Sequence, residues 1–256
     1  MMNVLAFDIE TVPDVDGGRR IYGLGDLDDK DVGQAMLTKR RQHTDSEFLP
    51  LHLHRVVAIS AVLRSADMFK VWSLGSLEST EAELITRFFE GVERYTPTLV
   101  SWNGSGFDLP VLHYRSLIHG IQAARYWDAG EEDRDFRWNN YLNRFHYRHT
   151  DLMDVISGYQ ARGFAPLDEI AVLLGFPGKL GKSGADVWPQ YLAGRLQEIR
   201  DYCETDALNT YLVYLRWQLI RGHVTRPEWE KECVLVRSAL QQEGKPHLEE
   251  FLRAWR

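Results

Sequence analysis

The sequence predicts an α/β protein in which helices cover a single sheet. Two observations support this fold class. Strand-like apolar runs gather near the N-terminus, and helices then alternate with one further strand. Because no stretch has the composition of a linker, we expect one domain over residues 1–256, with insertions at about 14–54 and 122–148.

The first expected strand begins at Val4 and runs into two acids, Asp8 and Glu10. Side chains on a strand alternate between its faces, so these two acids point the same way. Two neighbouring buried carboxylates repel each other and lose hydration, and a cation between them offsets both costs. The pair therefore indicates half of a divalent-metal site. An ordinary surface-facing pair of acids at a strand end is the alternative.

Next come the elements between this strand and residue 97. The Asp/Gly cluster at 14–18 is expected to break regular structure, whereas part of 30–43 has helical character. A β-branched run at 56–63 predicts a central strand, and 68–72 predicts its neighbour, so the first three strands form an antiparallel meander. A helix over 80–95 follows, with a capping box at its start.

The second half of the chain is mainly helical. Its expected elements are a strand at 98–102 and helices at 109–118, 167–174, 196–220 and from about 228. A loop rich in glycine and lysine, 178–184, precedes the longest of these helices.

The overall composition restricts the choice of partners and compartment. The net charge is −7, whereas a protein that relies on nonspecific phosphate neutralisation is usually basic. If this protein binds nucleic acid, metal ions and local basic groups must offset the repulsion. Without an apolar run of about 18 residues, no membrane span is expected. The two cysteines, Cys203 and Cys233, have no C-x-x-C spacing, and no secretory signal is evident, so we expect a cytoplasmic protein.

Two later motifs add acids to the first pair. In the turn Asn103-Gly-Ser-Gly-Phe107-Asp108, the glycines allow tight geometry, and Asp108 is expected at a helix N-terminus, where simple N-capping is the alternative. On the long helix, Tyr202 and Asp206 are four residues apart and share one face. A carboxylate on an apolar helical stripe needs a partner, which is either a ligand or a hydrogen bond within the core.

Together these motifs resemble the DEDD (DnaQ-like) 3′–5′ exonuclease superfamily, whose pattern is D-x-E, then N-x-x-x-F-D, then Y-x-x-x-D. Tyr202 corresponds to the DEDDy branch. The phrases 149–152 and 202–207 are most similar to the exonuclease domain of family B DNA polymerases. The resemblance covers roughly residues 3–220. It includes no polymerase domain, so we expect a freestanding unit like the bacterial polymerase-B-like exonucleases, and it leaves both expected insertions unmatched.

The resemblance implies a ribonuclease-H-like fold, a mixed five-stranded sheet flanked by helices. It also implies that four acids bind two Mg²⁺ or Mn²⁺ ions while Tyr202 orients the attacking water, with 5′-mononucleotides released from the 3′ end of single-stranded DNA. Carboxylate oxygens suit such hard cations. The implied metal ligands are Asp8, Glu10, Asp108 and Asp206.

Further assignments concern the substrate. Thr11 and Asn103 are candidates for holding the terminal nucleotide, and Phe107 for packing beneath its sugar or base. Lys182 is a candidate for reaching the scissile phosphate, as a lysine does in some family B exonuclease domains; a solvated loop lysine is the alternative. The arginine and aromatic residues of 122–148 either contact a single strand or form the core of a small subdomain.

Two rival functions remain at this level. The same motifs serve exoribonucleases of the ribonuclease D type, because a metal site at a 3′ end hardly contacts the 2′ position. A nucleic-acid-binding module that has lost its chemistry is the second rival. Such decayed sites usually lose an acid, whereas all four acids and Tyr202 are present in this chain.

Overall fold

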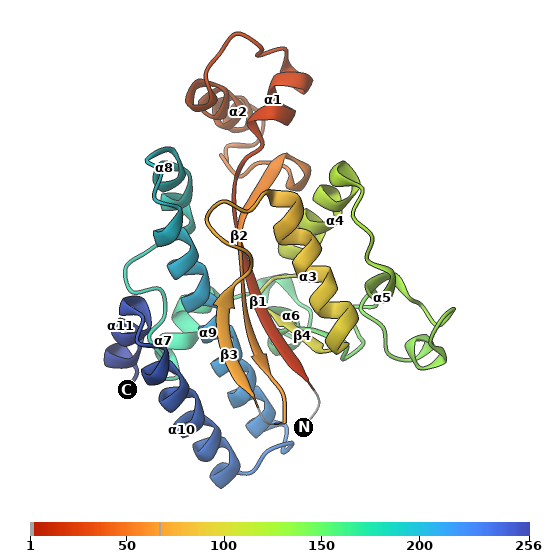
Figure 1. Cartoon of the computed structure of the whole chain (residues 1–256), viewed down its shortest axis with the longest axis vertical. Coiled ribbons are helices and arrows are strands. Elements are labelled where there is room, and N and C mark those ends of the chain that lie inside the picture. The colour runs from red at the N-terminus through yellow and green to blue at the C-terminus, as the bar shows by residue number, and fades with distance from the viewer. Residues whose placement is uncertain (1–2, 67) are drawn as a thin grey trace.

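The computed structural model describes residues 3–66 and 68–256 and is built on a five-stranded sheet (Figure 1). The strand order is β3-β2-β1-β4-β5, with β1 antiparallel to β2, β2 antiparallel to β3, and β4 parallel to both β1 and β5. The predicted mixed five-stranded sheet is therefore confirmed, as is the meander. The strands are β1 (Val4–Pro13), β2 (His54–Arg64), β3 (Phe69–Ser73), β4 (Thr98–Ser101) and β5 (His149–Asp151).

Helices cover both faces of the sheet (Figure 1). On one face, Leu5, Phe7 and Ile9 of β1 belong to a core that contains the apolar side chains of α3 (Glu81–Tyr95) and α4 (Asp108–His119). The alternate residues of β1, including Ala6, face α9 (Leu196–Ile220). By the same alternation, Asp8 and Glu10 also face α9.

The longer predicted helices are confirmed. Thr80 and Glu83 form the expected capping box of α3, and α9 has the predicted limits. The C-terminal helical segment is divided in two, because Gly244 ends one helix in the left-handed region and Pro246 begins the next. The remaining α-helices are α1 (Val15–Tyr22), α2 (Asp29–Thr44), α5 (Ala124–Trp127), α6 (Leu152–Ile156), α7 (Leu167–Leu173), α8 (Val187–Leu192), α10 (Arg226–Glu243) and α11 (Pro246–Ala254).

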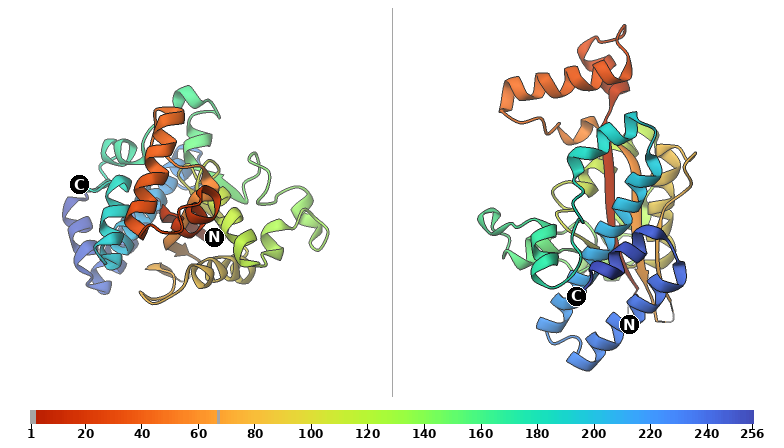
Figure 2. Two further views of the ribbon diagram at one scale, coloured as in Figure 1. Left: turned by 90° about the horizontal axis from the view of Figure 1, so that it is seen from above. Right: turned by 90° about the vertical axis from the view of Figure 1, so that its left-hand side faces the viewer.

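The expectation that residues 14–18 break regular structure is wrong. Asp14 caps α1 by accepting a hydrogen bond from the Gly17 amide, and Gly18 lets the helix approach Met36 of α2 closely. The α1–α2 pair lies beyond the end of the sheet reached by β1 (Figures 1 and 2). Gly33 of α2 lies against Trp188 of α8.

The aromatic residues of 122–148 divide into two groups. Tyr126, Phe136 and Tyr141 are buried and serve packing, but they join the core beneath α3 and α4 and do not form the core of a separate subdomain. Others are exposed, among them Trp138 at 84% and Phe145 at 63%. Within the described part of the chain, no helix is long and apolar enough to cross a membrane.

Candidate active site

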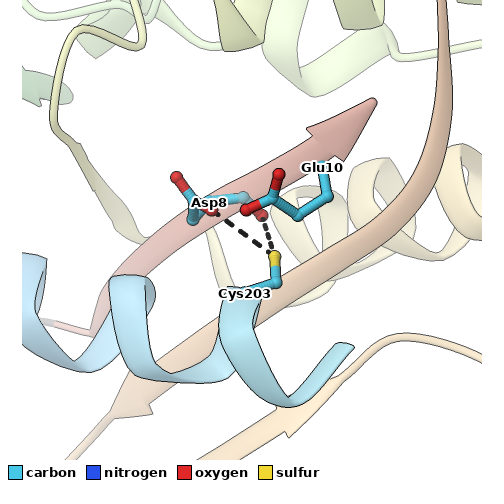
Figure 3. Close-up of side chains that lie close together, drawn as sticks. All are labelled: Asp8, Glu10 and Cys203. Carbon is cyan, nitrogen blue, oxygen red and sulfur yellow. Dashed lines mark hydrogen bonds between the residues drawn. The ribbon is translucent and has the colours of Figure 1, made fainter. Parts of the chain in front are cut away.

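Asp8 and Glu10 lie side by side on the α9 face of β1 (Figure 3). The ladder with β2 is regular up to Glu10 and shifts register between Glu10 and Thr11, so the acids stand at the last regular positions of the strand. Glu10 is buried and Asp8 is half-buried. Cys203 of α9 approaches them, and one ligand atom from each of the three residues lies within 4.8 Å of the others.

Asp108 is attached directly to the same strand. Its Oδ1 accepts a hydrogen bond of 3.2 Å from the Ile9 amide, between the two acids of β1. Phe107 occupies the N-cap position of α4, and Asp108 lies in the first helical turn. N-capping therefore does not explain why an acid stands at position 108.

A tight turn sets the position of Asp108. Asn103 has a positive φ of 64°, and a Cβ at Gly104 would come within 2.2 Å of the Ser101 hydroxyl, so the turn requires glycine there. Asp151, at the end of β5, accepts hydrogen bonds of 2.9 Å from the amides of both Asn103 and Ser105. Asp151 thus fixes the turn.

Tyr202 and Asp206 approach the strand acids from α9, and both side chains are buried. The Lys179 ammonium donates to the Tyr202 hydroxyl oxygen at 2.6 Å and pairs with Asp206 Oδ2 at 3.2 Å. The other oxygen of Asp206, Oδ1, is buried and has no hydrogen-bond partner among the described residues. A buried carboxylate oxygen without a partner is costly, which points to a ligand that binds there.

Lys179 contacts two residues of the candidate site, and the sequence analysis did not single it out. Asn209 of α9 bonds both the amide and the carbonyl of Gly178, and Asp168 of α7 accepts from the Lys179 amide at 2.6 Å. The loop is therefore held by two helices, and its first lysine reaches the acids. Among the described contacts, none joins the Lys182 side chain to these acids. Both lysines lie in one Gly/Lys loop, and its composition could not distinguish them.

Burial and mutual repulsion raise the pKa values of the acids. The pKa of Asp8 is well above its ordinary value because its carboxylate loses hydration within the cluster and because Glu10, Asp108 and Asp206 are negative. The pKa of Glu10 is raised by burial and by Asp206, and burial raises that of Asp108 to about 7. The single Lys179 ammonium lowers the pKa values of Asp8 and Glu10 only in part. At neutral pH this cluster needs more positive charge than the side chains supply.

The donor set fits hard divalent cations. Four carboxylates offer oxygen ligands, and the orphaned Oδ1 of Asp206 belongs to this set. Cys203 is a poor candidate ligand for such ions because thiolates prefer softer metals. Burial and the charge of Asp8 also raise the pKa of the Cys203 thiol, which donates to the Asp8 carbonyl oxygen at 3.3 Å.

The substrate-binding candidates flank this cluster. Thr11 Oγ lies 2.9 Å from His54 Nδ1, and His54 Nε2 lies 3.1 Å from the Leu49 carbonyl oxygen. Since a carbonyl can only accept, Nε2 carries the ring proton and Nδ1 accepts from the Thr11 hydroxyl. The Phe107 ring meets the His54 ring edge-on at 5.1 Å. Asn103 borders a separate pocket of about 400 Å³ between α4 and the 122–148 segment.

Comparison with known proteins gives the family of this chain. Residues 46–255 match a family model described as a predicted 3′–5′ exonuclease related to the exonuclease domain of PolB. The chain belongs to this family. It is thus a hydrolytic exonuclease of the PolB-like type, a class that acts on nucleic acid and uses divalent metals. The matched range contains Asp108, Tyr202 and Asp206 and begins after β1.

Curated relatives include the catalytic polypeptides of DNA polymerase epsilon from several fungi. The chain is 26% identical over 148 residues to the polypeptide from Saccharomyces cerevisiae. It is 27% identical over 147 residues to the corresponding protein from Aspergillus fumigatus. Each match covers 55% of this chain but only 6% of the relative.

Proposed function

We propose that this exonuclease uses two Mg²⁺ or Mn²⁺ ions to release 5′-mononucleotides from the 3′ end of single-stranded DNA. The observation that carries the proposal is the convergence of Asp8, Glu10 and Asp206 on one ammonium group, with Asp108 bonded to the same strand and one buried carboxylate oxygen left without a partner among the described residues. In this proposal the metal ligands are Asp8, Glu10, Asp108 and Asp206, within a single domain that carries insertions at 14–54 and 122–148.

The bound ions would supply an activated water and neutralise the charge that develops on the leaving 3′ oxygen. Burial and the nearby Asp206 raise the pKa of Tyr202, so its hydroxyl stays protonated and orients the water instead of acting as a base. The Lys179 ammonium has only protons to donate, so the Tyr202 oxygen accepts and the Tyr202 proton stays available for a second partner. We assign this proton to the attacking water.

The same logic gives Lys179 a second role. In this structure its ammonium partly compensates the charge of Asp206. With the acids neutralised by metal, that ammonium is free to pair with a non-bridging oxygen of the scissile phosphate. Thr11, Asn103 and Phe107 remain our candidates for holding the terminal nucleotide, and Lys182 is the alternative to Lys179 as the phosphate contact.

The direction of the Thr11 hydrogen bond is fixed, because the Thr11 hydroxyl donates its proton to His54 Nδ1. Its oxygen can then only accept from the substrate. A 3′-hydroxyl on the terminal sugar is a donor of the required kind, which supports recognition of a free 3′ end.

Hydrolysis of end-labelled single strands in Mn²⁺ tests the function. We expect the wild type to release mononucleotides, and Asp8→Ala and Asp206→Ala to abolish release while keeping the far-ultraviolet circular dichroism spectrum. Unchanged hydrolysis in either variant would exclude the proposed site. Hydrolysis rates on DNA and RNA strands of matched sequence show which nucleic acid is preferred. Faster trimming of RNA would favour the exoribonuclease. Binding without hydrolysis would favour the non-catalytic module.

A further inference from the structure

Phe48 is a large apolar side chain at the edge of the candidate active site. It lies in the loop between α2 and β2 and is 56% exposed. Its ring centroid is 5.6 Å from that of Phe107 and 5.3 Å from that of His54. We call these three rings, Phe48, His54 and Phe107, the aromatic shelf. Because His54 also bonds Thr11, the shelf lies beside the end of β1.

The loop holds Phe48 in place although its ring is exposed. The Phe48 amide donates to the Ser46 hydroxyl at 3.1 Å, and its carbonyl oxygen accepts from Arg40 Nε at 2.9 Å. The next residue, Leu49, is buried in the small core formed with α1 and α2. A ring on an anchored loop loses little conformational freedom when a ligand covers it, so its exposure is compatible with a binding role.

The shelf is continuous with the acidic cluster. Phe107 immediately precedes Asp108, and Thr11, which bonds His54, immediately follows Glu10. A strand whose last phosphodiester lies at the acids must place its bases within reach of neighbouring surfaces. Aromatic rings bind bases by stacking, without regard to sequence. The Arg40 guanidinium at the same loop adds a positive charge that suits the strand's phosphates.

The ring spacing determines how bases can use the shelf. A base inserted between two rings needs about 7 Å between them, twice the spacing of ~3.4 Å between stacked bases. The centroids of Phe48 and Phe107 are only 5.6 Å apart, and the rings are tilted by 53°. The two rings therefore leave no room for a base between them, so successive bases would have to lie on separate rings.

We infer that Phe48 carries the base of the penultimate nucleotide, next to a terminal nucleotide on Phe107. This inference rests on the proposed function and deepens it, because it gives the 14–54 segment a role in substrate binding. Two successive bases that lie on separate rings are not stacked on each other, as the paired bases of a duplex are. The shelf thus selects a 3′ end that is unpaired over at least its last two nucleotides.

The test measures the first cleavage of a thymidine oligonucleotide and of the same strand with an abasic site at the penultimate position. Phe48→Ala should lower kcat/KM about tenfold on the intact strand, mainly through KM, and by less than about twofold on the abasic strand. Phe48→Trp should restore the activity, because it retains an aromatic face. Equal losses on both strands, or no loss on either, would overturn the inference.

Val234→Ala is the control, since Val234 is exposed to a similar extent, at 63%, but lies on α10 and outside every residue set assigned to the substrate. It should leave both rates unchanged, and a loss equal to that of Phe48→Ala would count against the shelf. Fluorescence anisotropy in Ca²⁺ measures binding of the same strands separately. If Phe48→Ala weakens binding but the wild type does not hydrolyse the strand in Mn²⁺, the proposed function alone is contradicted. If the wild type hydrolyses the strand and Phe48→Ala does so at the same rate, the shelf alone is contradicted.

Discussion

Glu204 and Asp206 are buried acids two residues apart on α9, and their surroundings differ completely. Glu204 accepts hydrogen bonds from Ser73 on one oxygen, and from Lys245 and His247 on the other. Burial alone would raise its pKa, but His247 and Lys245 lower it to about 2. Asp206 has one ammonium partner and an orphaned oxygen among the described residues, and burial raises its pKa.

The comparison shows how burial can serve two purposes on a single helix. The protein completes the hydrogen bonds of Glu204, which joins α9 to β3 and to α11. It leaves the cluster around Asp206 short of positive charge, an arrangement that costs stability unless a cation binds. A buried acid that lacks partners is therefore the better indicator of a functional site.

Activity should separate the two acids most strongly. Asp206→Asn should lower Mn²⁺-dependent exonuclease kcat by at least about a hundredfold, because it removes a charged oxygen ligand from the cluster. Glu204→Gln should keep kcat within about threefold, since its partners are structural. Steady-state rates on one labelled strand measure both. Comparable losses in the two variants would remove the distinction.

The variant that keeps its activity should be the one that loses stability. Glu204→Gln should cost about 3 kcal/mol, or roughly 6–12 °C in Tm, because it breaks a buried charged network. Asp8→Asn should raise the Tm of the metal-free protein, because it relieves repulsion among the acids. Thermal melts in a chelator measure both shifts. A destabilised Asp8→Asn variant would mean that the acids are compensated by groups other than a metal.

The same two regions should respond differently to pH. Folding raises the pKa of Asp108 from 3.8 to about 7, so the folded metal-free protein binds more protons and loses stability as the pH rises between these values. Folding lowers the pKa of Glu204 from 4.5 to about 2, so its contribution is complete above pH 4.5 and is lost below it. Comparing melts of the wild type and Asp108→Asn between pH 5 and 8 isolates the Asp108 contribution, because the buried His113 and His149, whose pKa values are lowered to about 4, titrate in both proteins. Identical profiles of the two proteins in chelator would contradict it.

A bound metal ion should restore the stability that the metal-free protein loses when its clustered acids ionise. Saturating Mn²⁺ should raise the Tm by about 5 °C or more, the effect of a ligand at about a hundred times its Kd on a protein of this size. Asp206→Asn should lose most of this shift. Glu204→Gln should show the full shift, although its Tm without metal is lower than that of the wild type. Differential scanning fluorimetry with and without Mn²⁺ gives the comparison. Equal shifts in both variants would place the ion elsewhere.

The smallest effect concerns the lysine loop. Lys179→Met should lower kcat by about tenfold, since its ammonium contacts both Tyr202 and Asp206. Lys182→Met, a matched change three residues away, should alter kcat by less than about twofold. Rates at saturating substrate measure the two. If Lys182→Met were the more damaging change, Lys182 would be preferred as the phosphate contact.

Much of the fold could be predicted because the relevant signals are local. Alternation along β1, the capping box of α3 and the apolar stripe of α9 each depend on near neighbours in the sequence. The strand β5 was missed because three residues, His149–Asp151, carry no periodicity. Helix α1 was missed because its Asp/Gly sequence is stabilised by the Asp14 cap and by close packing on Met36, which is distant in sequence.

The site divides in the same way. The spacing of Asp8, Glu10 and Asp206 revealed which faces carry acids, because that depends on helix and strand geometry alone. Lys179 and not Lys182 reaches the acids because Asp168 and Asn209, on two other elements, hold the loop in place. The approach of Phe48 to Phe107 likewise joins residues far apart in the chain. Such contacts exist only after the chain has folded.

A crystal soaked in Mn²⁺ and a mononucleotide, measured at the manganese absorption edge, tests the metal site most directly. We predict two anomalous peaks among the four acids, with an oxygen of Asp206 bound to one ion and the Lys179 ammonium withdrawn from that carboxylate. No peak at the acids, with Lys179 still paired to Asp206, would contradict the assignment of this cluster as the catalytic metal site.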